Sequence, residues 1–466
     1  MTRHRSPAWF PGTAIALTIA LAALDSPLAQ GATASDVTSV TLENGMQIIV
    51  WPDHDIPNIA LYNWVRVGSR NEAPGITGLA HFFEHMMFNG TSTRQPGEFD
   101  KVLEANGARN NASTSNDVTI YQDWLPAAAL ETVFALEADR LSNLAFEPKV
   151  VESERGVVYS ERRNSVDDNP SSRLQEQVQA AAFVAHPYGI PTIGWPSDIE
   201  SWKIDDLKEF FQRNYAPNNC TMVLVGDLDP QATIALARKY FEPIPAREGP
   251  KQIVTIEPPQ TGERRLTLAT DAQTPLIQFA YHGIASADPR SAALELLMRI
   301  LADGDASRLH RALVEEQKLA ISADGYVQSG FDPGLIWFFL SLPGDSGAGD
   351  GDSGPDTVKN SNLAAAEKSF DAQIARVRSE GVTKAELTRA KNQALADFWR
   401  GQATIDGKAE ALGSYAVMRG GYRKLFEAPQ AYERVTLADI KKVAGELLQD
   451  SSRTVGLLPV AAEAKP

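Results

Sequence analysis

Two histidines and a glutamate lie within five consecutive residues: His81, Glu84 and His85. Gly75 and Gly78 precede them and allow a turn, and the apolar, proline-free run that follows predicts the start of a helix. Residues four apart lie on one face of a helix, so we expect both imidazoles to point the same way. Two such imidazoles can begin a zinc site, and Glu84 is placed to take a proton from a water molecule at the metal.

A catalytic zinc site needs a third protein ligand, and residues 152–162 offer two glutamates for that role. Glu154 and Glu161 are seven residues apart, so they share a face if the segment is helical. The alternative is a solvated helix face on which Arg155 and Arg162 neutralise the two carboxylates. Local pairing of those arginines does not exclude a metal role, so both interpretations stay open at this point.

With these residues the chain resembles the pitrilysin/insulinase family of zinc metallopeptidases, the inverzincins. Glu161 lies 76 residues after His85 and seven after Glu154, which is the spacing of that family. The resemblance implies one zinc ion per chain, held by His81, His85 and Glu161, with Glu154 steadying the ligands. It also implies a zinc endopeptidase that hydrolyses peptides or unfolded polypeptides, with Glu84 as the general base.

Residues 107–121 form a polar segment that reads as extended, with hydrophobic side chains alternating toward a core near its end. Taken alone, this pattern favours an ordinary exposed edge strand. The resemblance adds that Asn111 and Ala112 match the edge strand on which that family receives its substrate as an added strand. Main-chain pairing of this kind gives affinity without strict sequence choice.

The length and composition indicate a protein of several domains. The chain has 466 residues, which predicts two or three domains, and its 43% hydrophobic and 22% charged residues suit a soluble globular protein. The net charge of −15 argues against a nucleic-acid-binding protein. Proline and glycine crowd residues 242–262, the best candidate for a linker.

We therefore predict four segments: a signal peptide (1–34), an N-terminal peptidase domain with the zinc site (35–245), a linker (246–262) and a C-terminal homologous domain without the metal motif (263–460). The second half repeats the first in outline, and its helix over residues 291–301 stands where the metal helix stands, without a histidine. The resemblance implies an α+β fold. It comprises two related domains, each a mostly antiparallel sheet packed with helices, together half of a clamshell.

The first 34 residues predict export. Arg3, His4 and Arg5 precede a short apolar run over residues 13–24, and a small-x-small pattern follows at residues 32–34. An uncleaved anchor is the alternative; no later stretch approaches the length of a membrane span. The single cysteine, Cys220, excludes an intrachain disulfide, and its neighbours predict a buried strand. An exported, acidic, disulfide-free enzyme fits a bacterial periplasm.

One departure from the family bears on partners. Family members carry an arginine and a tyrosine seven residues apart in the second half; here Val314 and Ile321 occupy those positions, and neither side chain can donate a hydrogen bond. Since half-length members of the family pair, we expect the zinc-bearing chain of a heterodimer whose homologous partner supplies the missing pair. A homodimer is the alternative, in which Arg308 or Tyr326 replaces the pair or no group does.

Two other classes remain as alternatives. The first is a non-catalytic scaffold or binding homologue with a relict metal site; Glu84 argues against it, because a structural zinc has no use for a free carboxylate. The second is a metallohydrolase that does not cleave peptides, which the edge-strand resemblance disfavours. The Gly/Asp-rich segment 344–354 predicts a surface loop, and we expect no order after residue 460.

Overall fold

The computed structural model describes residues 33–269, 272, 274–344 and 355–460. The predicted signal peptide (except residues 33 and 34), the Gly/Asp-rich segment beyond residue 344 and the tail after residue 460 lie outside the described residues. Within the described ranges, no helix combines the length and the hydropathy that crossing a bilayer requires.

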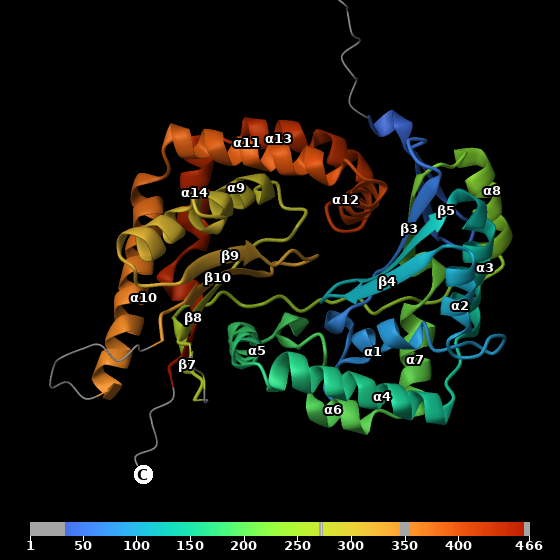
Figure 1. Cartoon of the computed structure of the whole chain (residues 1–466), viewed down its shortest axis with the longest axis horizontal. Coiled ribbons are helices and arrows are strands. Elements are labelled where there is room, and N and C mark those ends of the chain that lie inside the picture. The colour runs from blue at the N-terminus through green and yellow to red at the C-terminus, as the bar shows by residue number, and fades with distance from the viewer. Residues whose placement is uncertain (1–32, 270–271, 273, 345–354, 461–466) are drawn as a thin grey trace, which may run out of the picture.

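The first half of the chain forms a six-stranded sheet, seen on the right of Figure 1. Its strand order is β1-β2-β6-β3-β5-β4, and all neighbours are antiparallel except the parallel pair β2 and β6. β1 and β2 form a hairpin whose turn contains Asn44-Gly45, where Gly45 has a φ of 87°. The strands are β1 (Thr38–Thr41), β2 (Gln47–Pro52), β3 (Asn58–Val65), β4 (Arg109–Thr114), β5 (Thr119–Pro126) and β6 (Cys220–Gly226).

The second half forms a five-stranded sheet with the same plan. Its order is β7-β11-β8-β10-β9, again with one parallel pair, β7 and β11, and antiparallel neighbours elsewhere. Strands β2, β6, β3, β5 and β4 of the first sheet thus correspond in order to this sheet, which confirms the α+β fold of two related units. The strands are β7 (Arg264–Thr267), β8 (Leu276–His282), β9 (Ser322–Val327), β10 (Leu335–Ser341) and β11 (Arg453–Leu458).

The helices follow the same repeat. α1 comes after β3 in the first half, and α9 comes after β8 in the second, as the sequence predicts. The first-half helices are α1 (Leu79–Met86), α2 (Glu98–Ala105), α3 (Leu130–Asn143), α4 (Pro148–Arg162), α5 (Pro170–Ala182), α6 (Pro196–Ser201), α7 (Ile204–Asn214) and α8 (Pro230–Phe241). The second-half helices are α9 (Ser291–Ala302), α10 (Pro355–Glu380), α11 (Lys384–Gly401), α12 (Ile405–Val417), α13 (Ala428–Arg434) and α14 (Leu437–Leu447).

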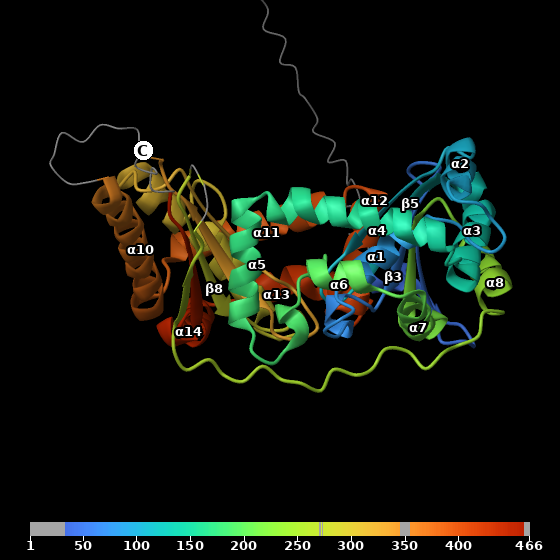
Figure 2. The same ribbon diagram turned by 90° about the horizontal axis from the view of Figure 1, so that it is seen from below.

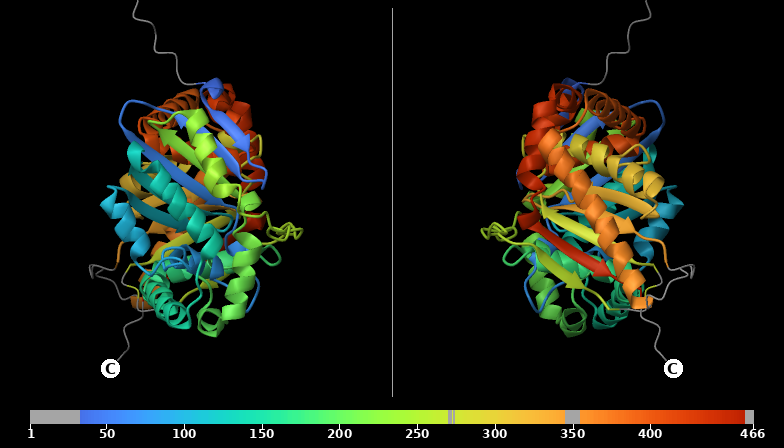
Figure 3. Two further views of the ribbon diagram at one scale, coloured as in Figure 1. Left: turned by 90° about the vertical axis from the view of Figure 1, so that its right-hand side faces the viewer. Right: turned by 90° about the vertical axis from the view of Figure 1, so that its left-hand side faces the viewer.

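Each half also covers the other half's sheet with one helix. Most helices pack on one face of their own sheet, as the two end views in Figure 3 show. The opposite face of the first sheet is covered by α12, and that of the second sheet by α5. Both approaches are so close that only glycine fits: a Cβ on Gly413 would lie 2.1 Å from the Trp64 indole nitrogen, and one on Gly456 2.3 Å from Val178.

This exchange joins the two halves through their cores. The segment between α8 and β7, which includes the predicted linker, contains no helix or strand and runs along the outside of the molecule in Figure 2.

Cys220 is buried in β6, and burial raises the pKa of its thiol to about 12, so it is a core residue and not a nucleophile.

Candidate metal centre

Helix α1 is held at its first turn by a buried carboxylate. Gly78, at φ 87°, begins the helix, and Glu72 accepts hydrogen bonds from the backbone N–H groups of Gly78 and Ala80, each 2.7 Å long. A side chain at Gly78 would collide with the Ile193 carbonyl, 2.6 Å away. The helix is fixed in rotation by its buried face, which leaves the other face free for chemistry; that buried face consists of Leu79, Ala80, Phe82, Phe83 and Met86.

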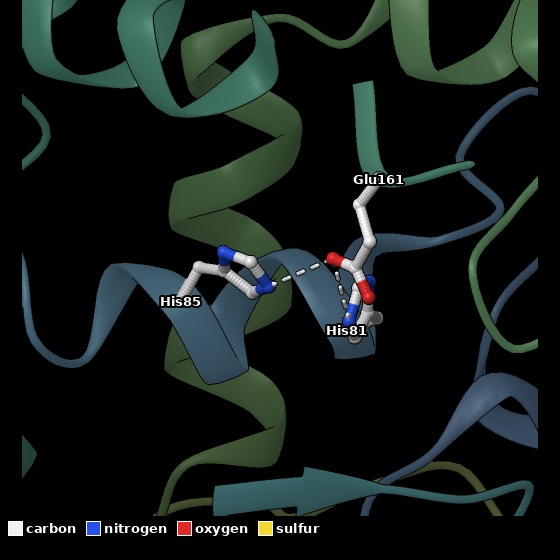
Figure 4. A group of neighbouring side chains, drawn as sticks. All are labelled: His81, His85 and Glu161. Carbon is white, nitrogen blue, oxygen red and sulfur yellow. Dashed lines mark ion pairs between the residues drawn. The ribbon is translucent and has the colours of Figure 1, made fainter. Parts of the chain in front are cut away.

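His81 and His85 lie on the free face of α1 and converge on Glu161 of α4. One carboxylate oxygen of Glu161, Oε2, lies 3.6 Å from His81 Nε2 and 3.4 Å from His85 Nε2 (Figure 4). In the part of the chain that the structure describes, these three form the one group of histidine, cysteine and carboxylate ligands close enough to hold a metal ion. Burial lowers the pKa of His81 to about 4, so its imidazole is neutral and able to bind a metal.

The second glutamate of α4 supports the first helix. Glu154 Oε1 lies 2.8 Å from His85 Nδ1, the ring nitrogen that faces away from Glu161. Its other oxygen accepts a hydrogen bond of 2.9 Å from the Asn89 side chain. Although burial opposes it, hydrogen bonding to Glu154 and Glu161 raises the pKa of His85 to about 9, and His85 in turn lowers the pKa of both carboxyl groups. Glu154 thus holds the His85 ring in one orientation.

The two arginines of α4 do not neutralise these glutamates. Arg155 bonds to Glu152 at 2.9 Å and to the Trp202 carbonyl. Arg162 is buried and forms a bidentate ion pair with Glu176, with N–O distances of 2.8 and 3.0 Å. The simple solvated-face alternative for Glu154 and Glu161 is therefore not the arrangement observed.

Glu84 has a partner that the sequence did not indicate. Its Oε2 accepts a hydrogen bond of 2.5 Å from the Thr114 hydroxyl, at the end of β4. Burial raises the pKa of Glu84, while the Thr114 hydrogen bond opposes that rise. Thr114 and Asn89 are the two site residues that sequence reasoning missed. Asn89 lies one helical turn beyond His85, so its spacing could have drawn attention; Thr114 lies 30 positions from Glu84 and gave no such signal.

β4 is the free edge of the first sheet, as the sequence predicts. Asn111 pairs with Gln122, and Ala112 pairs with Tyr121, both on the single neighbouring strand β5. The other side of β4 has no neighbouring strand among the described residues. Because Thr114 contacts Glu84, this edge begins at the candidate metal centre and runs away from it.

Arg308 and Tyr326, the two residues that could replace the missing arginine and tyrosine, both have partners within the chain. Val314 packs against the second core, and Ile321 is 59% exposed. Arg308 is held by Glu386 and by the Gly381 carbonyl. The Tyr326 hydroxyl accepts a hydrogen bond of 2.8 Å from Gln175. His186 accepts a hydrogen bond from the Tyr188 N–H and is not part of the metal centre.

Known proteins resemble this chain over most of its length. The model of the insulinase family (peptidase family M16) matches residues 52–195, and that of the peptidase M16 inactive domain matches residues 201–394. The zinc protease PqqE of Helicobacter pylori is 30% identical over 90% of this chain and 92% of its own length. This chain belongs to peptidase family M16. His81, Glu84, His85 and Glu161 all lie within the insulinase match.

Two solved structures share the fold of this M16 member. A protease from Helicobacter pylori has a TM-score of 0.84 and 28% identity, covering 91% of this chain and 99% of its own. The first half of the periplasmic protease PqqL from Escherichia coli has a TM-score of 0.72 and 22% identity, covering 91% and 92%. The names of the similar proteins support a zinc-dependent peptidase.

Proposed function

We propose that this chain is a zinc-dependent endopeptidase in which His81, His85 and Glu161 hold one zinc ion. The observation that carries the proposal is the convergence of two imidazole Nε2 atoms on one carboxylate oxygen at 3.4 and 3.6 Å. Ligand atoms about 2.0–2.1 Å from a tetrahedral zinc stand roughly 3.3–3.4 Å apart, so the donor set and its spacing fit this metal. Three protein ligands leave one position open, as in catalytic zinc sites.

Each residue around the metal has a separate role in peptide hydrolysis. A zinc ion in this site would polarise the scissile carbonyl and lower the pKa of a water molecule. Glu84 takes the proton from the attacking water and delivers it to the leaving nitrogen. Thr114 fixes the carboxylate of Glu84, and Glu154 directs Nε2 of His85 toward the metal by holding its Nδ1.

The edge strand sets the kind of substrate. A peptide added beside β4 would pair with the main chain around Asn111 and Ala112, and its scissile bond would reach Glu84 near Thr114. Only an extended segment can pair in this way, so the substrates are peptides or unfolded polypeptides. The net charge of −15 remains an argument against nucleic acid as a ligand.

The lack of an arginine and tyrosine pair in the second half supports a two-chain enzyme. In this proposal a homologous partner subunit faces the metal centre and supplies the two groups, giving a heterodimer. In the homodimer alternative the chain is self-sufficient, but Arg308 and Tyr326 are both engaged within their own chain.

Two further parts of the proposal concern export and domain limits. Residues 1–34 act as a signal peptide that directs the chain to the periplasm, the compartment of the similar protease PqqL from Escherichia coli. Residues 35–245 and 263–460 form the two domains, joined by 246–262. The lack of helix and strand in the joining segment supports this division.

A non-catalytic role is the second candidate, because one of the two matching family models describes an inactive domain. That match covers residues 201–394, which contain none of the residues of the metal centre. The carboxylate of Glu84, fixed by Thr114 beside the ligands, favours catalysis over a structural metal.

Glu84→Gln separates the two functions. Zinc content should stay at one ion per chain, because the ligands are untouched, and hydrolysis of a quenched peptide should fall by about 10² or more, as loss of a general base requires. Glu131→Gln, an exposed glutamate on α3, is the matched control. Equal turnover by Glu84→Gln and the wild type would rule out the assigned role. Zinc-loaded chain that is silent alone and active with a homologous partner would identify the heterodimer.

A further inference from the structure

Two equivalent hairpins, one from each half, meet at their tips. The β4–β5 turn (residues 115–118) and the β9–β10 loop (residues 328–334) hold corresponding places in the two sheets. Gln328 donates a hydrogen bond of 2.6 Å to the Asn116 side chain, and the Phe331 N–H donates one of 3.0 Å to Asp117. The half without the metal centre thus touches the turn that ends the edge strand β4.

Asp117 is the centre of this contact. It is 1% exposed, and its carboxylate also accepts hydrogen bonds from Arg70, at 2.8 Å, and from the Tyr188 hydroxyl, at 2.7 Å. The second guanidinium nitrogen of Arg70 lies 2.7 Å from Asp332 of the β9–β10 loop. A buried charge is tolerated only when it is paired and hydrogen-bonded, so Asp117 needs these partners, which come from both halves.

The contact is closely packed as well as charged. A Cβ on Gly330 would lie 2.4 Å from the Tyr188 hydroxyl oxygen and 2.8 Å from Asp117 Oδ2. The loop can approach the turn this closely only because residue 330 has no side chain. The Asp332 carboxylate also lies 3.2 Å from His186 Nε2, within hydrogen-bond distance. The loop therefore contacts the first half at several points.

The β4–β5 turn is connected to the Glu84 carboxylate through Thr114, the last residue of β4. The Ser115 N–H donates to the Val118 carbonyl at 2.9 Å, which closes the turn and fixes Thr114 just before it. The Thr114 hydroxyl then holds Glu84 at 2.5 Å. Movement of the turn would therefore move the group that orients Glu84.

We infer that the β9–β10 loop of the second half is a positioning element for Glu84, acting through Asp117 and Thr114. Asp332 and Gly330 are positioning residues and not catalytic ones, since they touch neither metal ligands nor Glu84. This inference rests on the proposed function, and it gives the half without metal ligands a defined part in the reaction.

The test compares three variants of the zinc-loaded full chain, assayed with its partner if one is required. Asp332→Asn removes the charge that faces Arg70, and Gly330→Ala forces the loop away from Asp117. Both should retain zinc and lose activity mainly in kcat, by about tenfold to 100-fold, because small misplacements of a catalytic group cost this much. The matched control is Lys408→Met, which breaks a different ion pair between the halves, with Asp53, and should leave kcat unchanged.

A double-variant comparison with Thr114→Val distinguishes positioning from a general loss of stability. If Asp332 acts through Thr114, the double variant loses little more activity than the more damaging single variant. Losses that multiply would overturn the inference, and so would an Asp332→Asn variant that behaves like Lys408→Met.

Hydrogen exchange provides a readout that does not depend on turnover. Asp332→Asn should speed the exchange of amides in residues 114–118 and leave those of β6 unchanged. Unchanged exchange in the turn would refute the coupling, even if the wild-type chain cleaved no peptide. Failure of the proposed function would instead appear as a zinc-loaded wild type, with its partner, no more active than Glu84→Gln.

Discussion

Different side chains join the same pair of helices in the two halves. In the first half, α4 brings Glu161 to the two histidines of α1. In the second half, α11 brings Asp397 to Arg299 of α9, with 2.6 Å between the charged atoms. Glu161 and Asp397 occupy the same position in their helices, thirteen residues after Pro148 and Lys384.

The difference teaches what each half can do. A guanidinium carries its charge on its own side chain, so Arg299 satisfies Asp397 permanently and needs no ion. On the exposed face of α9, Glu295 is likewise held, by Arg419 at 2.8 Å and by the Tyr432 hydroxyl. In the first half the Glu161 carboxylate instead faces two imidazole nitrogens, which, unlike a guanidinium, can give up a proton and become metal ligands.

The largest effect should follow from removing a proposed metal ligand. His81→Ala and Glu161→Gln should each bring the zinc content from one ion per chain toward zero. Peptide hydrolysis should fall by at least about 10³-fold, because the water then keeps a pKa far above neutral. Metal analysis and turnover of a quenched peptide measure the two effects, and a chelator should reproduce the loss in the wild type.

The same changes in the second half provide the control. Asp397→Asn and Glu295→Gln remove carboxylates from the equivalent helices, yet zinc content and kcat should stay at wild-type values. Retention of stoichiometric zinc by His81→Ala, or loss of zinc from Asp397→Asn, would contradict the division of roles between the halves.

Local sequence patterns predicted the parts of the site that lie on one helix each. The spacing of His81, Glu84 and His85 fixes their common face, and that of Glu154 and Glu161 does the same on α4. The polar, extended pattern of residues 107–121 predicted an exposed edge strand, which is β4, and the corresponding strand orders confirm two related units. These features depend on the periods of helix and strand, which a sequence displays directly.

Contacts between distant segments could not be predicted in this way. Thr114 reaches Glu84 only because β4 passes α1, and no period in the sequence relates the two. The local sequence also does not predict that α5 covers the second sheet and α12 the first, because an amphipathic pattern shows that a helix packs on a core but not on which one. The same holds for the pairing of Arg70 with Asp332 across the halves.

A smaller effect is expected from the residue behind His85. Glu154→Gln keeps the side-chain shape but weakens the bond to His85 Nδ1, so zinc affinity or activity should fall by about 10- to 100-fold. Competition with a zinc chelator measures the affinity. Glu152→Gln, on the same helix but 72% exposed and paired with Arg155, should change neither quantity. Equal affinities for the two variants would show that Glu154 does not support the metal centre.

The smallest effect on catalysis should come from Arg308, one of the two residues that could replace the missing pair in the homodimer alternative. Arg308 is held by both carboxylate oxygens of Glu386, at 2.7 and 2.8 Å, and this pairing lowers the pKa of Glu386 to about 2. Arg308→Met should therefore lower the free energy of unfolding, by about 1.5–3 kcal/mol for lost charged hydrogen bonds. It should leave kcat unchanged, because the guanidinium is committed to its own chain.

The outcome tests the form of the homodimer alternative in which Arg308 acts in catalysis. If Arg308 instead supplied the missing donor in a homodimer, its loss would cost about 10²- to 10³-fold in kcat, as removal of an oxyanion-stabilising group does. The double variant Arg308→Met, Glu386→Gln removes both charges, while the amide oxygen can still accept the Thr383 hydrogen bonds that cap α11, so part of the stability should return. A double variant that is stable but has lost kcat would place Arg308 in the reaction. One with wild-type kcat would leave the missing groups to be supplied by another residue or by a partner chain.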